Sequence, residues 1–122
     1  MSRDGTVRLV FFGEERPFRL AIGQLRALQE ACKAGPMTIF RRLVSGEYFV
    51  DDIRETIRLG LIGGGATDKD AFRIVANTVD AGVPLDQHCD TAATILEAAL
   101  LGPEDEKPKK QKGAKAPADP PD

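Results

Sequence analysis

Residues 50–65, with the sequence VDDIRETIRLGLIGGG, constrain the fold of this chain more than any other segment. The segment opens with two aspartates, whose charge and side-chain oxygens suit the free N–H groups at a helix start. Ile53, Ile57 and Leu61 recur every four residues and share one face with Gly60. Three glycines then follow, and glycine readily adopts the left-handed conformation that ends helices. The segment therefore predicts an amphipathic helix of about three turns.

Two apolar residues of this helix, Leu59 and Ile62, lie off the shared face and are neighbours on the helix surface. In a small domain, such a second apolar surface is covered either by the same chain or by a partner. We expect a partner-binding surface at Leu59, Ile62, Gly63, Gly64 and Gly65, where the glycines would allow close approach of a partner's backbone. The alternative is that one of the two later helices of the same chain covers this surface.

The first 22 residues predict a β-hairpin. Residues 6–12 and 17–22 alternate apolar and polar side chains, as strands with one buried face do, and residues 13–16 form a turn between them. A lone two-stranded hairpin is barely stable, so its apolar face must pack on helices. The residues expected to face inward are Val7, Leu9, Phe11, Phe18, Leu20 and Ile22.

Apolar periodicity and turn residues predict four further helices, over residues 23–34, 36–45, 67–81 and from 84 or 86 to 101. Thr67 to Asp70 match the spacing of a capping box, with aspartate in the place of the usual Glu or Gln. The residues expected to be buried in the first three are Leu25, Leu28, Cys32, Met37, Phe40, Leu43, Val44, Phe72, Val75, Ala76 and Val79. The fold class is therefore α+β, an N-terminal two-stranded β-hairpin packed on about five short α-helices.

The composition changes after Gly102. Residues 103–122 contain no aromatic residue, leucine, isoleucine or valine, but they contain repeated proline and five lysines matched by five acidic residues. Such a segment cannot bury enough apolar surface to offset its ordering entropy. We therefore expect one domain over residues 1–102 and a disordered Lys/Pro-rich tail over residues 103–122, solvated rather than bound to nucleic acid.

The charge and hydropathy of the chain exclude several classes of protein. Lys+Arg number 17 and Asp+Glu 19, giving a net charge of -2, and the folded part lacks the basic surplus of a nucleic-acid binder. The sequence has no apolar run of transmembrane length and no signal-peptide core, so we expect a cytoplasmic protein without membrane contact. A hydrophobic content of 42% suffices for one core, although a domain of this size often gains stability from a partner, including a second copy.

No enzymatic motif in the sequence is complete. Gly60, Gly65 and Thr67 have the spacing of a phosphate-binding loop, but Ala66 occupies the position of the essential lysine. The glycines also follow a helix, whereas a phosphate loop follows a buried strand. We therefore interpret them as a helix end and a turn, and we expect no nucleotide cofactor.

The single histidine does not complete a reactive site. His88 and Cys89 are neighbours, and neighbours on a helix point about 100° apart, which prevents them from acting together as base and nucleophile. One histidine and the two cysteines, Cys32 and Cys89, also fall short of the four ligands of a zinc site. We expect His88 to be solvated, Asp86 and Asp90 to form a polar helix face, and both cysteines to be reduced thiols. Catalytic residues and metal ligands are thus not expected.

The order of these short motifs resembles the small tail-assembly-chaperone family of gene transfer agents and related tailed phages, whose members are also labelled tail tube proteins. Asp51-Asp52, Arg54-Glu55 and the GLIGGG of residues 60–65 match the family's signature helix in order. The resemblance spans residues 6–102 and excludes the tail. It includes, outside the signature helix, Gly13, Glu14, Arg16, Phe18, Arg19, Leu20, Gly23, Leu25, Leu28, Glu30, Val79, Asp80, Pro84, Leu85, Ile95, Leu96, Ala98, Ala99, Leu100 and Gly102.

This resemblance implies a non-catalytic protein from a bacterial prophage or gene-transfer-agent cluster. It would assist tail assembly in the cytoplasm by binding the tape-measure protein and the tail tube protein. The alternative is a structural tube or connector subunit that stays in the tail of the phage-like particle.

Overall fold

The computed structural model describes residues 4–82 and 84–102, and the expected tail lies outside these residues. The elements follow the α+β order predicted from the sequence, with an N-terminal antiparallel hairpin and five α-helices in this part of the chain. In chain order they are β1 (Val7–Phe11), β2 (Glu14–Phe18), α1 (Ile22–Cys32), α2 (Pro36–Ser45), α3 (Val50–Gly63), α4 (Asp68–Asn77), the 3-10 helices η1 (Val79–Ala81) and η2 (Leu85–His88), and α5 (Cys89–Leu101).

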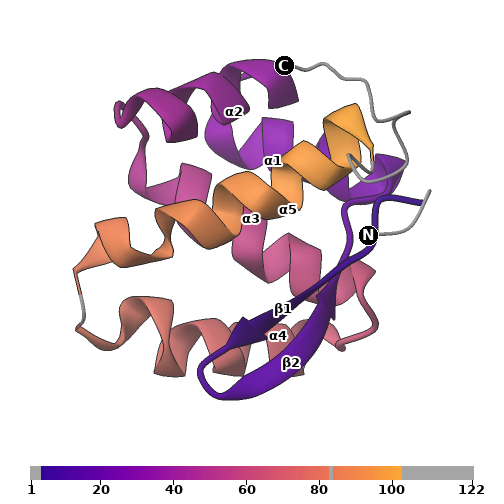
Figure 1. Cartoon of the computed structure of the whole chain (residues 1–122), viewed down its shortest axis with the longest axis vertical. Coiled ribbons are helices and arrows are strands. Elements are labelled where there is room, and N and C mark those ends of the chain that lie inside the picture. Colours follow the sequence, from indigo (N-terminus) through magenta and orange to yellow (C-terminus); the bar gives the residue numbers. More distant parts are fainter. Residues whose placement is uncertain (1–3, 83, 103–122) are drawn as a thin grey trace, which may run out of the picture.

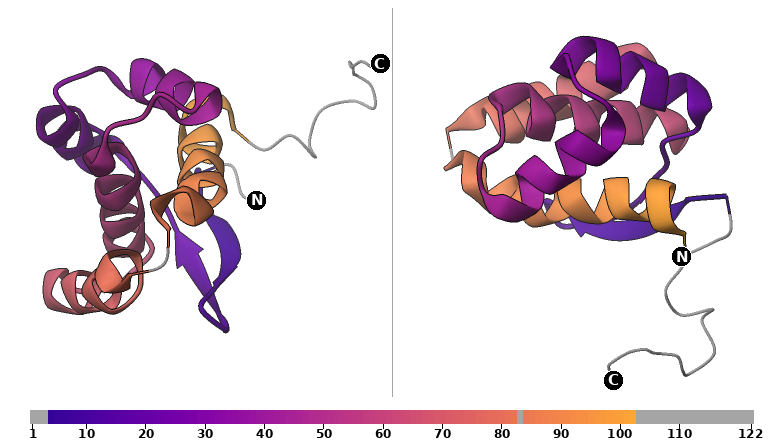
Figure 2. Two further views of the ribbon diagram at one scale, coloured as in Figure 1. Left: turned by 90° about the vertical axis from the view of Figure 1, so that its left-hand side faces the viewer. Right: turned by 90° about the horizontal axis from the view of Figure 1, so that it is seen from above.

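Helix α3 is the centre of the fold and contacts α1, α2, α4, α5 and β2 (Figure 1). Its buried face carries Ile53, Ile57 and Leu61 together with Gly60, as the four-residue repeat predicted. The hairpin lies on the outer side of α5 (Figure 2), where Phe18 is fully buried. The core is therefore one continuous cluster around α3, closed on one side by the hairpin.

The predicted hairpin is confirmed, but its turn and second strand were placed too late in the sequence. The connection consists of Phe12 and Gly13 alone, both with positive φ (54° and 85°), as in the type I′ turns that suit hairpin twist. Glu14 therefore pairs with Phe11, and residues 14–16, predicted as turn, belong to β2. Ile22, predicted as a buried strand residue, instead begins α1 and is 67% exposed.

Three helices differ in phase or length from the prediction, and one of them is α5, which begins at Cys89 rather than at residue 84 or 86 because Leu85–His88 form η2. In α2 the buried residues are Ile39 and Leu43, whereas Val44 is 66% exposed. Met37 of the same helix also lies at the surface. Helix α4 ends at Asn77, and the chain continues as η1, so a single helix does not reach residue 81.

In α4, Ala71 and Val75 face the core, and the predicted core residue Phe72 is 59% exposed. Neighbouring helix positions differ by about 100°, so a phase error of one residue exchanges a buried for an exposed side chain. The start of α4 was predicted well, since the Thr67 hydroxyl accepts a hydrogen bond from the Asp70 N–H at 3.0 Å.

Both cysteines are free thiols held by backbone carbonyls. Cys32 donates to the Asp51 carbonyl at 3.4 Å and Cys89 to the Leu43 carbonyl at 3.1 Å. Within residues 4–82 and 84–102, no helix has both the length and the apolar character that membrane crossing requires.

Candidate functional site

The glycine turn at the end of α3, residues 63–65, packs tightly against the end of β2 and Arg19, the residue that follows it. A Cβ atom added to Gly63 would lie 1.9 Å from the Arg19 carbonyl oxygen, and one on Gly64 would lie 2.1 Å from the Pro17 carbonyl oxygen. The Arg19 N–H also donates to the Gly60 carbonyl at 2.9 Å. The close backbone approach that the sequence assigned to a partner at Gly63 and Gly64 is therefore made by the chain's own hairpin.

Gly65 has a different role from the two glycines before it. It has a φ of 122°, a conformation that side chains disfavour, and no heavy atom lies within 4 Å of its added Cβ. Its N–H donates to the Ile62 carbonyl at 3.0 Å, and the Ala66 N–H donates to the Leu61 carbonyl at 3.0 Å. Gly65 therefore ends the helix and stays exposed.

The two apolar residues of the predicted partner surface have different environments. Leu59 is only 6% exposed, so the alternative that the chain itself covers this residue is the one the structure shows. Ile62 is half-buried. Gly63 and Gly64 are partly exposed but packed against the hairpin, and the rest of the accessible surface at this end of α3 is a rim formed by Ile62, Gly65 and Ala66.

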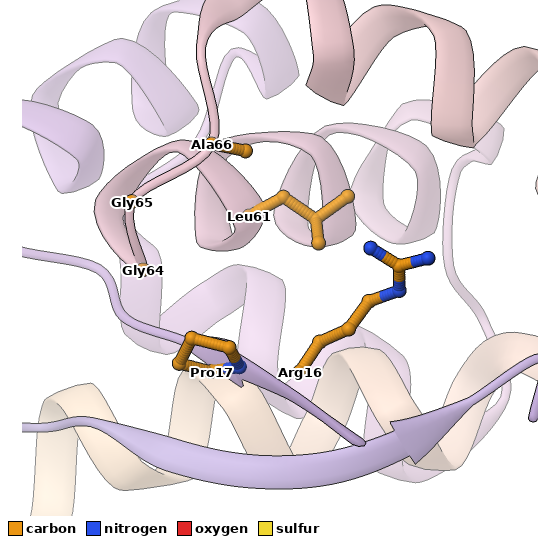
Figure 3. Close-up of a pocket in the computed structure, with 6 residues that line it drawn as sticks. All are labelled: Arg16, Pro17, Leu61, Gly64, Gly65 and Ala66. Carbon is orange, nitrogen blue, oxygen red and sulfur yellow. The ribbon is translucent and has the colours of Figure 1, made fainter. Parts of the chain in front are cut away.

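A cavity of about 290 Å³ opens between this turn and β2 (Figure 3). Its lining residues are Arg16, Pro17, Leu61, Gly64, Gly65 and Ala66. The Arg16 side chain extends from β2 towards Leu61, and one of its terminal nitrogens pairs with Glu14 at 2.9 Å. Its Nε is buried and has no hydrogen-bond partner within the described residues. The cavity therefore combines an apolar wall with a cation that retains hydrogen-bonding capacity.

The start of α3 is held by a buried ion pair that sequence reasoning missed. Asp52 is fully buried, and both of its oxygens accept hydrogen bonds from Arg42 of α2, at 2.7 and 2.8 Å. Asp52 also caps the helix, because it accepts the Phe49 N–H at 2.7 Å. The Arg42 guanidinium lies 4.1 Å from the centre of the Phe49 ring. The acidic pair predicted a cap correctly, but nothing in the sequence pointed to Arg42.

The Arg-Glu pair of α3 belongs to a second network of charges. Arg54 forms hydrogen bonds to Asp80 of η1 at 3.1 to 3.2 Å and to Glu55 at 3.0 Å. The bonds to Asp80 raise the pKa of Arg54. Glu55 also accepts from Arg58 at 2.5 Å. These side chains satisfy one another, so their arrangement ties α3 to η1 and presents no free acid or base.

His88 was predicted to be solvated, and this prediction is wrong. Its side chain lies under the hairpin turn, where its ring stacks on Phe12 with centroids 5.7 Å apart, and the residue is 5% exposed. Burial lowers the pKa of His88, which favours the neutral ring. The apolar pattern around residue 88 could not indicate a contact with a turn so distant in the sequence.

The two thiols are poor nucleophiles in these surroundings. Burial and the nearby Asp52 carboxylate raise the pKa of Cys32 to about 12, and burial and Asp86 raise that of Cys89. Thiols in this state carry almost no thiolate at neutral pH. Among residues 4–82 and 84–102, no group of three or more His, Cys, Asp or Glu side chains could hold a metal ion.

A family model described as phage tail tube protein, GTA-gp10, matches residues 4–102. The match covers the whole fold from the residues before β1 to the end of α5. No curated protein matches the chain, and no solved structure does.

Proposed function

The chain belongs to this family of phage tail tube proteins, and from that membership we propose that it is a tail assembly protein which binds the tape-measure protein, the tail tube protein or both. The observation that carries the proposal is the match over residues 4–102, which includes every described element. The family consists of tail structural and assembly proteins, so the role is binding rather than catalysis. We place this role in the cytoplasm of the bacterial host, where tails are built.

The alternative function is a structural tube or connector subunit that stays in the particle, and the family description names a tube protein. Purified particles separate the two roles. Quantitative mass spectrometry should find the chain absent or far below one copy per tail if it acts only during assembly. Many copies per particle would contradict our proposal and support the structural role.

We propose that the partner contacts the rim of Ile62, Gly65 and Ala66 and enters the cavity beside Arg16. An acidic or carbonyl group carried on an apolar segment fits this cavity, because Arg16 supplies the donor and Leu61 the apolar wall. Burial of Leu59 removes it from the proposed surface, since an acidic residue at that position would disrupt the core.

The charge reversal Arg16→Glu tests this contact. The variant should fold normally but lose co-purification with the tape-measure or tube protein and lower the yield of tailed particles. Arg26→Glu, the same change at an exposed residue of α1, is the matched control and should have no effect. Normal partner binding by folded Arg16→Glu protein would remove the cavity from the proposal without affecting the family assignment.

A further inference from the structure

One edge of the hairpin has no partner strand. In a hairpin with a two-residue turn, the residues flanking the turn form a hydrogen-bonded pair, and such pairs alternate along the ladder. Phe11 opposite Glu14 is that first pair, and Leu9 opposite Arg16 is the next one. The backbone N–H and C=O groups of Arg8 and Val10 therefore point away from β2.

The position of Pro17 agrees with this alternation. Pro17 lies opposite Arg8, at a position where β2 donates no hydrogen bond to β1, and it has no N–H to donate. Its carbonyl points to the other side, where it meets Gly64. In the part of the chain that the structure describes, no backbone hydrogen bond from outside the hairpin reaches Arg8 or Val10. Val10 is 72% exposed, and Figure 2 shows the hairpin as the outer layer of the molecule.

The two edges of the hairpin are not equivalent. The β2 edge is closed by α3, through the contact of Gly64 with Pro17 and the hydrogen bond from Arg19 to Gly60. Pro17 also has no N–H to donate, so along the described strand the β2 edge offers a shorter match to a β1 edge than a second β1 does. The better match on a second copy is therefore β1 itself.

We propose that β1 pairs with β1 of a second copy, antiparallel about a two-fold axis at Leu9. This register places Arg8 opposite Val10 of the other copy on both sides of the axis and satisfies all four outward N–H and C=O pairs. The next register, centred on Val10, would require Phe12 to pair with Arg8, but the φ of 54° at Phe12 takes it out of the strand. The backbone thus favours the Leu9 register over the one centred on Val10.

The side chains of β1 are complementary to a second β1 in this register. The two Leu9 side chains, half-buried on the inner face, become neighbours and extend the apolar layer. On the outer face, Arg8 extends across the exposed Val10 towards Glu15 of the other copy. The pair Arg8–Glu15 already lies 3.7 Å apart within one hairpin, so each copy offers the opposite charge at the required position. No like charges face each other across the axis.

One strand pair buries less surface than a standard stable interface, so the dimer should form reversibly as the protein concentration rises over roughly 10 μM to 1 mM. Sedimentation velocity on the full chain measures this directly. Arg8→Glu should weaken association about tenfold, and the exchanged variant Arg8→Glu with Glu15→Arg should restore it. A chain that stays monomeric throughout this range would overturn the proposal.

Disulfide trapping tests the register itself. Across a non-hydrogen-bonded pair the two Leu9 Cα atoms would lie about 4.5 Å apart, a separation close enough for a disulfide. Leu9→Cys should therefore give a cross-linked dimer under mild oxidation. The two copies of residue 10 would be more than about 7 Å apart, so Val10→Cys is the matched control that should cross-link slowly. Equal rates for the two variants would overturn the register. The natural chain under the same oxidant controls for Cys32 and Cys89.

Discussion

Helix α3 is fixed at its start by charged side chains and at its end by bare backbone. At the start, Asp52 is fully buried and accepts two hydrogen bonds from Arg42 and one from the Phe49 N–H. At the end, Gly63 and Gly64 let the helix approach β2 so closely that no Cβ atom fits. The start of the helix therefore depends on the side chains of Asp52 and Arg42, and its end depends on the absence of a side chain at Gly63 and Gly64.

This difference determines which substitutions each end tolerates. A buried ion pair is sensitive to the loss of either partner, because the remaining charge stays desolvated without compensation. A contact between backbones does not depend on the side chains of the neighbouring residues, but it leaves no room for a side chain at the glycine itself. Three predictions test this distinction and a fourth concerns the hairpin turn, and they run from the largest expected effect to the smallest.

The largest effect is expected at the polar start. Asp52→Ala should lower the free energy of unfolding by about 3 to 5 kcal/mol, because it leaves Arg42 unpaired and removes the cap on the Phe49 N–H. Urea denaturation measures the change. Asp51→Ala, at the exposed neighbour, is the control. A loss no greater than that of the control would show that the buried pair contributes little.

A methyl group should be nearly as damaging at the glycine end. Gly63→Ala should lower the free energy of unfolding by about 2 to 3 kcal/mol, because its Cβ would clash with the Arg19 carbonyl and push the hairpin away. Gly23→Ala is the matched control, since no heavy atom lies near its added Cβ and alanine favours helix α1. If both variants were equally stable, the tight packing of the glycine turn would be contradicted.

At Gly60 an added Cβ would meet side chains, whereas at Gly63 on the same helix it would meet backbone atoms. An added Cβ would lie 3.1 Å from the Ile95 side chain and 3.3 Å from that of Phe18, and both can yield slightly. Overpacking costs about 1 to 3 kcal/mol, and the helix propensity of alanine offsets about 1 kcal/mol. We expect a net loss of about 1 kcal/mol for Gly60→Ala in thermal or urea unfolding. A stabilised protein would rule out close packing at this position.

Mild acid should lower the free energy of unfolding, because it protonates His88, whose ring stacks on Phe12 of the hairpin turn. The pKa of His88 is lowered in the folded protein, so the unfolded chain binds a proton more readily below pH 6.5. Stability contributed by the neutral ring is complete above pH 6.5 and is lost as the pH falls from there towards the folded pKa. We expect a loss below about 1 kcal/mol between pH 7 and 5, measured by urea titration. His88→Gln should flatten this slope, and an unchanged slope would exclude His88 as its source.

Burial was predicted best from the sequence where the apolar residues repeat along one face of a single helix. Ile53, Ile57 and Leu61 are spaced by about one helical turn, so their burial can be predicted without knowing which element packs against them. The cap at Thr67 depends on residues only three apart and was equally accessible. The hairpin was found by its alternation, but its turn was misplaced because the three charged residues after Gly13 were interpreted as turn, although they pair with β1.

The contacts that the sequence did not reveal join distant segments. Arg42 and Asp52 lie on different helices, and His88 meets Phe12 only after the hairpin folds over η2. For the glycine turn, the sequence was interpreted as allowing close approach of a partner's backbone. It could not say whether that backbone belongs to another molecule or, as at Gly63 and Gly64, to the same chain.

The contact between β2 and the glycine turn of α3 joins segments that the ribosome makes at different times. At roughly 5 to 20 residues per second, the ribosome adds Gly64 several seconds after Pro17, and Ile95 later still. Until then the hairpin is a pair of strands without the helices that stabilise it, with Phe11 and Phe18 uncovered. The hairpin is therefore made before the helices that stabilise it, and a nascent chain arrested before α3 should expose the hairpin to proteases and folding factors.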